Sequence, residues 1–351
     1  MRRGLVVALT LALGSLALSA CGSSTAPSTE VVGQPSLQIS VPLQVAACEG
    51  VGRCFAVGTT GLDTEPTSAA EMTTNSQHWS AIAAPSAPST ILTSAGCWAN
   101  GCIYAGSNAG GDVIWHNVNA NGISVTSAPT GGLGVTAVSC FATNQCAALD
   151  TSANGSMRVS FTTNGAASWS APKVVSAPAG ATGLSISCID AQHCVIGESG
   201  VMGAGAGAAW VATSDGFATT NSGSSFPTGA SWTQLTDLSC TTTRCVGRLS
   251  DSDGHSKVVV ANLTGQWFAT NPRWGSHLNV PITLDALACT PALRCVATGS
   301  SGDVGAVWVS DASGTWSALS LKYVGNPLTY AACSKSRCVA VNNWTVTAFA
   351  P

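Results

Sequence analysis

The chain carries little charge for its length. Only 8% of its 351 residues are Asp, Glu, Lys or Arg, against about 25% in an average soluble protein. The formal net charge is −3 at pH 7, so the sequence offers no basic stripe for the phosphate backbone of a nucleic acid. The composition therefore predicts no nucleic-acid partner, and it argues against binding to anionic surfaces through bulk charge.

The sequence also lacks the common catalytic and metal-binding motifs. It contains no G-x-S-x-G elbow, no H-E-x-x-H motif and no phosphate-binding loop. The stretch DSDGHS at 251–256 superficially resembles a calcium loop but lacks the downstream Glu, and it predicts a hairpin turn with Gly254 at positive φ. We therefore expect no catalytic residue, no metal and no cofactor.

Helical periodicity is absent after the first 20 residues. Apolar and polar residues instead alternate with a period of two, which is typical of half-buried strands. The clearest segments are MRVSF at 157–161, KVVVAN at 257–262 and AVWVS at 306–310. The sequence predicts an all-β protein.

Cysteine, by contrast, is plentiful and regularly spaced. Fourteen of the 15 cysteines form close pairs, and successive pairs begin 43 to 52 residues apart. The pairs are Cys48 and Cys54, Cys97 and Cys102, Cys140 and Cys146, Cys188 and Cys194, Cys240 and Cys245, Cys289 and Cys295, and Cys333 and Cys338. A period of this length lies in the range of propeller blades.

The spacing within each pair predicts a local disulfide. Members of a pair are five or six positions apart, which suits the two ends of a hairpin with a short turn, where facing Cα atoms come within disulfide range. The alternative is zinc, but zinc sites usually use a two-residue spacing and a second ligand pair nearby. We therefore predict seven disulfides, each closing its own hairpin.

Each pair is embedded in a repeat that predicts one blade. An apolar residue stands five positions before the first cysteine, with Gly183 as the exception, and the residue directly before that cysteine is always small. Repeats starting near 43, 92, 135, 184, 235, 284 and 328 predict a seven-bladed β-propeller of four-stranded blades over residues 36–351. The small residues are expected where the innermost strands crowd the central axis.

The ends of the chain predict how the last blade is completed. Only 13 residues follow Cys338, enough for two strands but not three. We predict that SLQIS at 36–40 supplies the missing strand. An open β-solenoid is the alternative, because it needs no exchange of strands between the two ends.

Several turns resemble the Asp-box, S-x-D-x-G-x-T-W, of sialidase-like propellers. They include TTNSQHW at 73–79, TTNGAASW at 162–169, NLTGQW at 262–267 and SDASGTW at 310–316. The resemblance implies a structural hairpin between the third and fourth strands of a blade, although Asn164 and Ala166 depart from the pattern. The Trp residues of these turns are expected to pack between blades.

The N-terminus predicts export. Arg2 and Arg3 precede a short apolar run that ends in LSAC at 18–21, as in a secretory signal, and the run is too short for a stable membrane span. LSAC resembles the lipobox of bacterial lipoproteins, which implies cleavage after residue 20, lipid on Cys21 and anchoring to the outer side of the cell membrane. Residues 22–35 then form a flexible linker. The alternative is a secreted protein cut near Ala20.

The sparse acidic residues give the last sequence-based hypothesis. Several follow the second strand of a repeat and predict an exposed acidic rim, our candidate binding site: Asp112, Asp150, Glu198, Asp253 and Asp303. The alternative is that turns simply favour polar residues. The sialidase resemblance would imply an arginine trio, a Tyr–Glu pair and an acidic Asp, but no position matches them. We expect a non-catalytic binding or scaffold protein for a protein or glycan ligand; the alternative is a divergent sialidase-like glycoside hydrolase.

Overall fold

The computed structural model confirms an all-β chain over the residues that it describes. These are residues 42–50, 52–59, 68–74, 79–86, 90–117, 121–177, 180–199, 208–223, 232–262, 267–270, 282–301, 304–311, 315–319, 328–335, 337–341 and 346–349. Strands alternate with turns throughout these ranges, and none of their residues is helical. No helix long and apolar enough to cross a membrane is found in them.

The first half of the chain forms three antiparallel sheets of four strands. The first sheet is β1 (Val45–Cys48), β2 (Cys54–Thr59), β3 (Ser68–Thr73) and β4 (Ser80–Ala81). The second is β5 (Ile91–Cys97), β6 (Cys102–Asn108), β7 (Gly111–Asn117) and β8 (Ser124–Thr126). The third is β9 (Gly132–Ala142), β10 (Gln145–Ser152), β11 (Met157–Thr162) and β12 (Lys173–Val174).

The second half repeats this up-and-down order. The fourth repeat consists of β13 (Thr182–Cys188), β14 (Cys194–Ser199), β15 (Ala209–Thr213) and β16 (Asn221–Gly223). The fifth consists of β17 (Trp232–Cys240), β18 (Arg244–Asp251), β19 (Ser256–Asn262) and β20 (Trp267–Thr270). One residue pair, Ser199 with Gln234, joins these eight strands into one sheet. Then follow β21 (Ile282–Cys289), β22 (Cys295–Ser301), β23 (Val304–Ser310) and β24 (Trp316–Leu319), and finally β25 (Tyr330–Cys333), β26 (Cys338–Val341) and β27 (Val346–Phe349).

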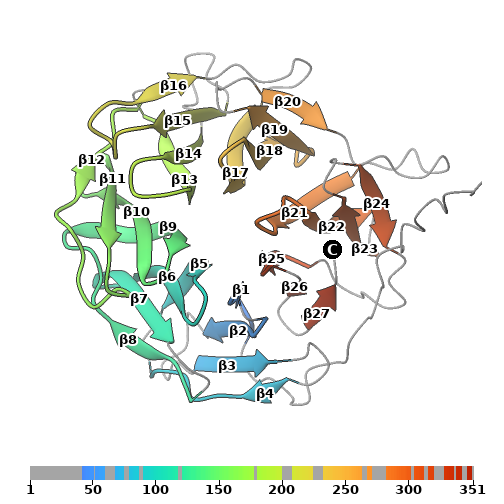
Figure 1. The fold of residues 1–351 in the computed structure, drawn as a ribbon, viewed down its shortest axis with the longest axis horizontal. Helices are drawn as coiled ribbons and strands as arrows, with labels where there is room; N and C mark the ends of the chain where they lie inside the picture. The colour runs from blue at the N-terminus through green and yellow to red at the C-terminus, as the bar shows by residue number, and fades with distance from the viewer. Residues whose placement is uncertain are drawn as a thin grey trace, which may run out of the picture.

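The sheets are arranged around a common centre (Figure 1). The first strand of each repeat lies nearest that centre, and the fourth lies outermost. Each first strand contacts the first strands before and after it, and β25, the first strand of the last repeat, also contacts β1. The two ends of the chain's described part therefore lie side by side.

The predicted disulfides are confirmed. All seven pairs are bonded, and each joins residues that face each other across a hairpin, with Cα atoms 4.0 or 4.1 Å apart. Cys140 and Cys146, for example, are direct partners in the β9–β10 register. Each bond thus fixes the innermost hairpin of its repeat.

The burial of the strands follows from their place between neighbours. Every residue of β2 is buried, because this strand lies inside its own sheet and has another sheet against each face. β15 alternates between buried and partly exposed residues, as a strand farther from the centre should. The largest fully buried side chains include Trp115, Trp308 and Tyr104. Trp79 and Trp316, which end two of the Asp-box-like turns, are also buried, in line with the predicted packing role.

The small residues before the cysteines lie where neighbouring first strands converge. A Cβ atom at Gly96 would lie 3.0 Å from the sulfur of Cys140 in the next sheet. At the same repeat position, the hydroxyl oxygens of Ser139 and Ser187 accept hydrogen bonds from the backbone amides of Cys188 and Cys240, both at 2.9 Å. Small side chains thus let adjacent sheets approach closely and bond to each other.

Gly183 replaces the usual apolar residue for a steric reason. A Cβ atom there would lie 2.6 Å from the sulfur of Met157 and 2.8 Å from Leu149. These two side chains of the preceding sheet leave no room for the leucine or valine that the other repeats have at this position.

Three of the turns between third and fourth strands share one hydrogen bond. A side-chain oxygen of Asn164, Asp215 or Asp311 accepts a bond of 2.9 to 3.0 Å from the backbone amide four residues later. In the first two turns a threonine hydroxyl two residues earlier also accepts an amide bond, which fixes a positive φ at Ala166 and Phe217. The turn at 162–169 therefore tolerates alanine in place of glycine.

The first and last sheets pack against each other. Leu43 and Trp79 share a buried cluster with Val339 and Val341, and the Arg337 guanidinium donates a bond of 3.3 Å to the Thr74 carbonyl. The predicted closing strand at 36–40 lies outside the described residues.

Candidate ligand-binding channel

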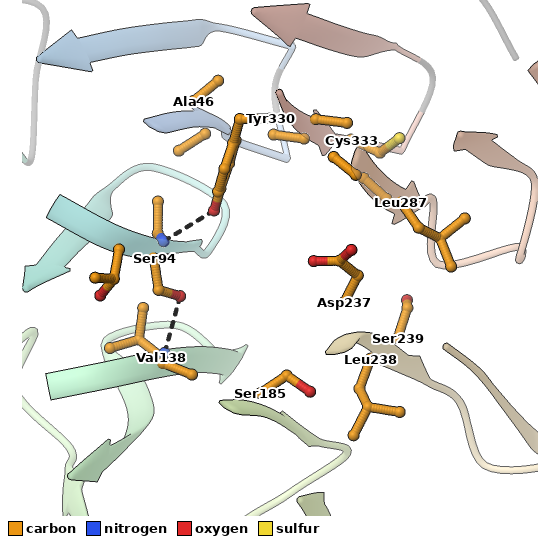
Figure 2. A pocket seen from close by; sticks show the side chains of 18 of the residues that line it. Ala46, Ser94, Val138, Ser185, Asp237, Leu238, Ser239, Leu287, Tyr330 and Cys333 are labelled. Atoms are coloured by element: carbon orange, nitrogen blue, oxygen red, sulfur yellow. Dashed lines mark hydrogen bonds between the residues drawn. The ribbon is translucent and has the colours of Figure 1, made fainter. Parts of the chain in front are cut away.

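The first strands enclose a cavity of about 420 Å³ at the centre of the molecule. Its lining comes from residues near the inner ends of every sheet, and most of these residues are small or apolar. Only three of the described lining residues are charged: Asp237, Arg248 and Asp285. Figure 2 shows the Asp237 carboxylate projecting into this space. A concave site with a few convergent polar groups is a typical ligand-binding site.

The two acidic residues depart from the repeat. Asp237 stands three positions before its first cysteine, where the other repeats have Val45, Ser94, Ala137, Ser185, Ala286 and Tyr330. Asp285 stands four positions before its first cysteine, where the others have Gln44, Thr93, Thr136, Leu184, Thr236 and Thr329. The sequence-based search missed both, although a comparison of the repeats position by position would have revealed them.

Irregular strands place both carboxylates. The β17–β18 register shifts between Thr236 and Ser239, and Asp237 adopts a left-handed backbone with φ of 53°. The β21–β22 register shifts between Leu284 and Ala286, at Asp285. Such bulges re-aim side chains, and here both occur beside the cavity.

Arg248 links the two sheets that carry these carboxylates. Its Nε donates a bond of 2.6 Å to Oδ2 of Asp237. Its Nη1 donates to the Leu284 carbonyl of the next sheet at 2.8 Å and to Oγ of Ser250 at 3.3 Å. The guanidinium is thus held by its own repeat and by its neighbour.

Asp285 is less engaged. Burial raises the pKa of its carboxyl, and the Arg248 charge opposes this only in part. Among the described residues, no hydrogen bond to its carboxylate is found. With two carboxylates and one guanidinium, the cavity carries a formal excess of one negative charge when both carboxylates are ionised.

Tyr330 also lines the cavity and is held in its protonated form. Its hydroxyl oxygen accepts a bond of 3.2 Å from the Ala95 amide, as drawn in Figure 2. Burial, with the Asp237 charge, raises the pKa of the phenol far above neutral pH. The environment therefore does not activate this tyrosine as a nucleophile.

Three of the five residues of the predicted acidic rim are not exposed. Asp150 and Glu198 occupy the same repeat position and are fully buried, and Asp112 is half-buried. This corrects the sequence-based interpretation: these second strands have sheets on both faces, so their acidic side chains turn into the interior. Asp303 lies outside the described residues.

Asp112 and Asp150 share one arginine. Nε of Arg158 donates a bond of 2.7 Å to Asp150. Burial raises the pKa of Asp112 to about 6, with a further rise from the Asp150 charge, and Arg158 and the Gly132 amide oppose the shift. Asp150 is thus buried and ion-paired, and Asp112 lies in the field of the same arginine, which is typical of a structural role.

Glu198 has no such partner. Neither of its carboxylate oxygens has a hydrogen-bond partner in the described part of the chain, and burial raises its pKa to about 7. It precedes Ser199, which forms the only residue pair between β14 and β17. Burial at this junction of two sheets favours the protonated form of the carboxyl relative to its state in water.

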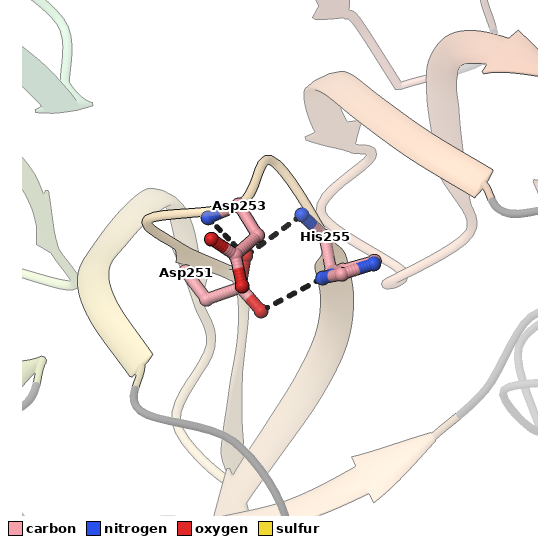
Figure 3. Close-up of side chains that lie close together, drawn as sticks. All are labelled: Asp251, Asp253 and His255. Carbon is pink, nitrogen blue, oxygen red and sulfur yellow. Dashed lines mark hydrogen bonds and ion pairs between the residues drawn. The ribbon is translucent and has the colours of Figure 1, made fainter.

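Asp253 is exposed and belongs to the β18–β19 turn (Figure 3). Ligand atoms of Asp251, Asp253 and His255 lie within 4.8 Å of one another. However, the Asp251 carboxylate already accepts backbone bonds from Asp253 at 3.0 Å and His255 at 2.8 Å. Gly254 has a φ of 84°, which confirms the predicted hairpin turn.

A second turn has the same geometry with a hydroxyl in place of the carboxylate. In the β10–β11 turn, the Ser152 hydroxyl accepts the Ser156 amide at 3.2 Å, and Gly155 has a φ of 81°. In both turns the backbone amide of the first residue donates a hydrogen bond to the carbonyl four residues later, from Ser152 to Ser156 at 2.9 Å and from Asp251 to His255 at 3.0 Å. The side-chain cluster at 251–255 is explained by turn formation.

Comparisons with known proteins identify the fold. No family model and no curated protein sequence matches the chain. It is similar to the structure "YCF48 bound to D1 peptide", with 13% identity, a TM-score of 0.60 and coverage of 92% of this chain and 94% of that one. It is also similar to the β-propeller domain of Cps50 (Swd1) from Myceliophteria thermophila, with 10% identity, a TM-score of 0.56 and coverage of 89% and 98%. The chain has a β-propeller fold.

A third likeness is to an enzyme. The GH74 xyloglucanase from Xanthomonas campestris is 10% identical with a TM-score of 0.59, and the match covers 92% of this chain but 53% of that one. Likenesses at this level of identity show the fold alone, because propellers serve many unrelated functions.

We predict that Glu198 makes stability fall as pH rises. The folded state raises its pKa from 4.5 to about 7, so between these values the folded state holds a proton that the unfolded state has released. Stability present below pH 4.5 should thus decline by about 3 kcal/mol up to pH 7. Glu198→Gln should flatten this decline in urea titrations from pH 4 to 8.

Asp253→Asn provides the control, because it removes an exposed carboxylate and should leave the pH profile unchanged. Parallel profiles for Glu198→Gln and the parent would contradict the assignment. Asp112, whose pKa is also raised, accounts for any decline that persists in Glu198→Gln.

Proposed function

We propose that this protein is a membrane-anchored, extracytoplasmic propeller that binds a segment of a partner protein at the mouth of its central channel. The observation that carries this proposal is the channel cavity, which brings the charged groups of two adjacent repeats to one recessed place. The structural likeness to a propeller described as bound to a peptide adds support.

Exposed aliphatic side chains beside the mouth favour a protein ligand. Ile91 and Leu133 are 53% and 61% exposed, and both lie near the beginning of a first strand, as Asp285 does in its own repeat. Ile91 pairs with Ser107 in the β5–β6 register, and a Cβ atom at Gly134, next to Leu133, would lie 2.7 Å from the same serine, so the two exposed side chains come from neighbouring sheets. Large apolar side chains grouped on a surface are typical of protein interfaces.

We further propose seven blades, the last completed by residues 36–40. Seven disulfide hairpins and the three described strands β25, β26 and β27 support this count. The packing of Val339 and Val341 against the first sheet supports closure. The hydrogen bonds of the 164–168 and 215–219 turns support their interpretation as Asp-box hairpins.

Membrane anchoring rests on Cys21. All other cysteines form disulfides, and Cys21 is the last residue of the lipobox-like LSAC. A linker at 22–35 spans at most about 50 Å when extended. The propeller would therefore meet its partner close to the membrane.

One observation favours the alternative, a divergent glycoside hydrolase: two carboxylates line the same cavity. Retaining and inverting glycosidases place two carboxyl groups on either side of the scissile bond. Here Asp237 is bonded to Arg248, and Asp285 lies in the field of the same guanidinium. One cation between both acids leaves no free pair to flank a sugar, so binding is the better-supported function. A screen with fluorogenic glycosides tests the alternative.

We predict that Thr329→Trp blocks binding. Thr329 is an exposed residue of the cavity lining, so an indole there should obstruct the mouth without disturbing the core. Peptides selected from a random phage library on the full chain in detergent should bind this variant at least ten times more weakly.

Ser124→Trp is the matched control, because Ser124 is exposed on the outermost strand β8, and it should bind the peptides normally. Selected peptides that bind both variants equally would overturn the channel as the site. Enrichment on a glycan array with no selected peptide would favour the glycan ligand instead.

Cys21→Ser should prevent lipidation and release the protein from the membrane fraction. Detergent phase partitioning measures this directly: the parent should enter the detergent phase and the variant should remain in water. Equal partitioning of the two would disprove the anchor.

Deleting residues 36–40 should leave an anchored but aggregation-prone protein. The loss would expose an unpaired edge on the last blade and the apolar surface that Leu37 and Ile39 are predicted to cover, a burial worth roughly 3–6 kcal/mol. Thermal unfolding and light scattering measure the effect. A deletion variant that melts with the parent would support the open solenoid.

A further inference from the structure

The charge within the channel points to the kind of group that it binds. Asp237, Arg248 and Asp285 are the charged residues of the described lining, and two of the three are acidic. Every other described lining residue is uncharged at neutral pH. An anionic ligand would meet a net repulsive field, and a cationic group would be attracted.

The two carboxylates are not equivalent. Asp237 already has a charged partner, since Nε of Arg248 lies 2.6 Å from its Oδ2. Nη1 of Arg248 also donates hydrogen bonds to the Leu284 carbonyl and to the Ser250 hydroxyl. This guanidinium therefore neutralises Asp237 and is not available to reorient fully toward Asp285.

Asp285 is the group left to receive a ligand. Its carboxylate has no hydrogen bond within the described residues and is only partly exposed. A partly desolvated carboxylate without a hydrogen-bonded partner gains more from an incoming cation than an exposed one, because the ion pair forms where water screens it less. The same burial raises its pKa.

Hydroxyl groups at the same repeat position line the side of the cavity across the centre from Asp285, which lies on β21 (Figure 1). Thr93 and Thr136 stand four residues before their first cysteines, as Asp285 does, and both line the cavity. Each hydroxyl donates its proton to a backbone carbonyl, Val135 at 2.9 Å and Leu149 at 3.2 Å. Their oxygen lone pairs remain free to accept bonds from N–H donors.

A ligand rich in N–H donors fits this lining better than a metal ion. Calcium takes six to eight oxygen ligands, usually several of them carboxylates, and only one carboxylate here is free of an arginine. An ammonium or guanidinium group needs one carboxylate and a few neutral acceptors.

We propose that the channel recognises a single cationic group, a lysine or arginine side chain or a free amino terminus, which pairs with the Asp285 carboxylate. The inference rests on the proposed function, because it names the part of the partner segment that enters the channel. It makes Asp285 the specificity-determining residue and Arg248 the residue that keeps Asp237 from competing.

The test uses two small probes on the full chain in detergent, followed by ligand-observed NMR. Nα-acetyl-lysine N-methylamide carries the cation, and Nα-acetyl-norleucine N-methylamide has a similar shape without the charge. The lysine compound should bind at least ten times more tightly than the norleucine compound, and its affinity should fall as salt rises.

Asp285→Asn should reduce lysine-compound binding at least tenfold and leave norleucine-compound binding unchanged. The substitution keeps the side-chain shape and removes no hydrogen bond found in the structure, so the variant should fold. Asp253→Asn, with the same loss of one charge on an exposed turn, should bind as the parent does. Equal binding to the parent and Asp285→Asn would overturn the inference.

The outcomes separate the two proposals. In one outcome, the selected peptides lose binding in Thr329→Trp, contain no basic group and bind Asp285→Asn normally. That result would refute cation recognition and support the binding function. Asp285-dependent binding of the lysine compound, with no selected peptide sensitive to Thr329→Trp, would support the cation site and refute the protein-segment function.

Discussion

The convergence of the first strands on one centre is the constraint on which the rest of the structure depends. Where these strands meet, a Cβ atom at Gly96 would touch the Cys140 sulfur, so only small residues fit. The same closeness lets Ser139 and Ser187 bond to the backbone of the next sheet. Disulfides then hold each inner hairpin in the shape that this crowding requires.

No sheet of this protein has a core of its own. Phe55, Tyr104 and Trp115 belong to one cluster although they come from two sheets, and Leu149 and Ile196 are joined in the same way in another. Each sheet is stable because its neighbours cover both faces. This also explains why the acidic residues of β10 and β14 are internal.

Departures from the repeat mark the channel. A repeat that merely stacks can use the same small, apolar inner strand each time, and most repeats do. Asp237 and Asp285 break this rule in adjacent repeats, and Asp237 also has a left-handed backbone. The shift of strand register at Asp285 is not a departure, because first strands β5 and β13 have one at the same position. Charge brought into a crowded apolar centre has no packing benefit, which is why the proposed ligand site is placed there.

The sequence alone determined the features that depend on near neighbours in the chain. Cysteine spacing indicated all seven hairpin disulfides, alternation indicated the strands, and Gly254 indicated its turn, because each involves residues a few positions apart. The tertiary structure decided which acids are buried and which meet. Glu198 was expected on a rim because its burial comes from other sheets, and Asp237, Arg248 and Asp285 come together only where two repeats meet. Such contacts depend on how sheets pack, which local spacing does not encode.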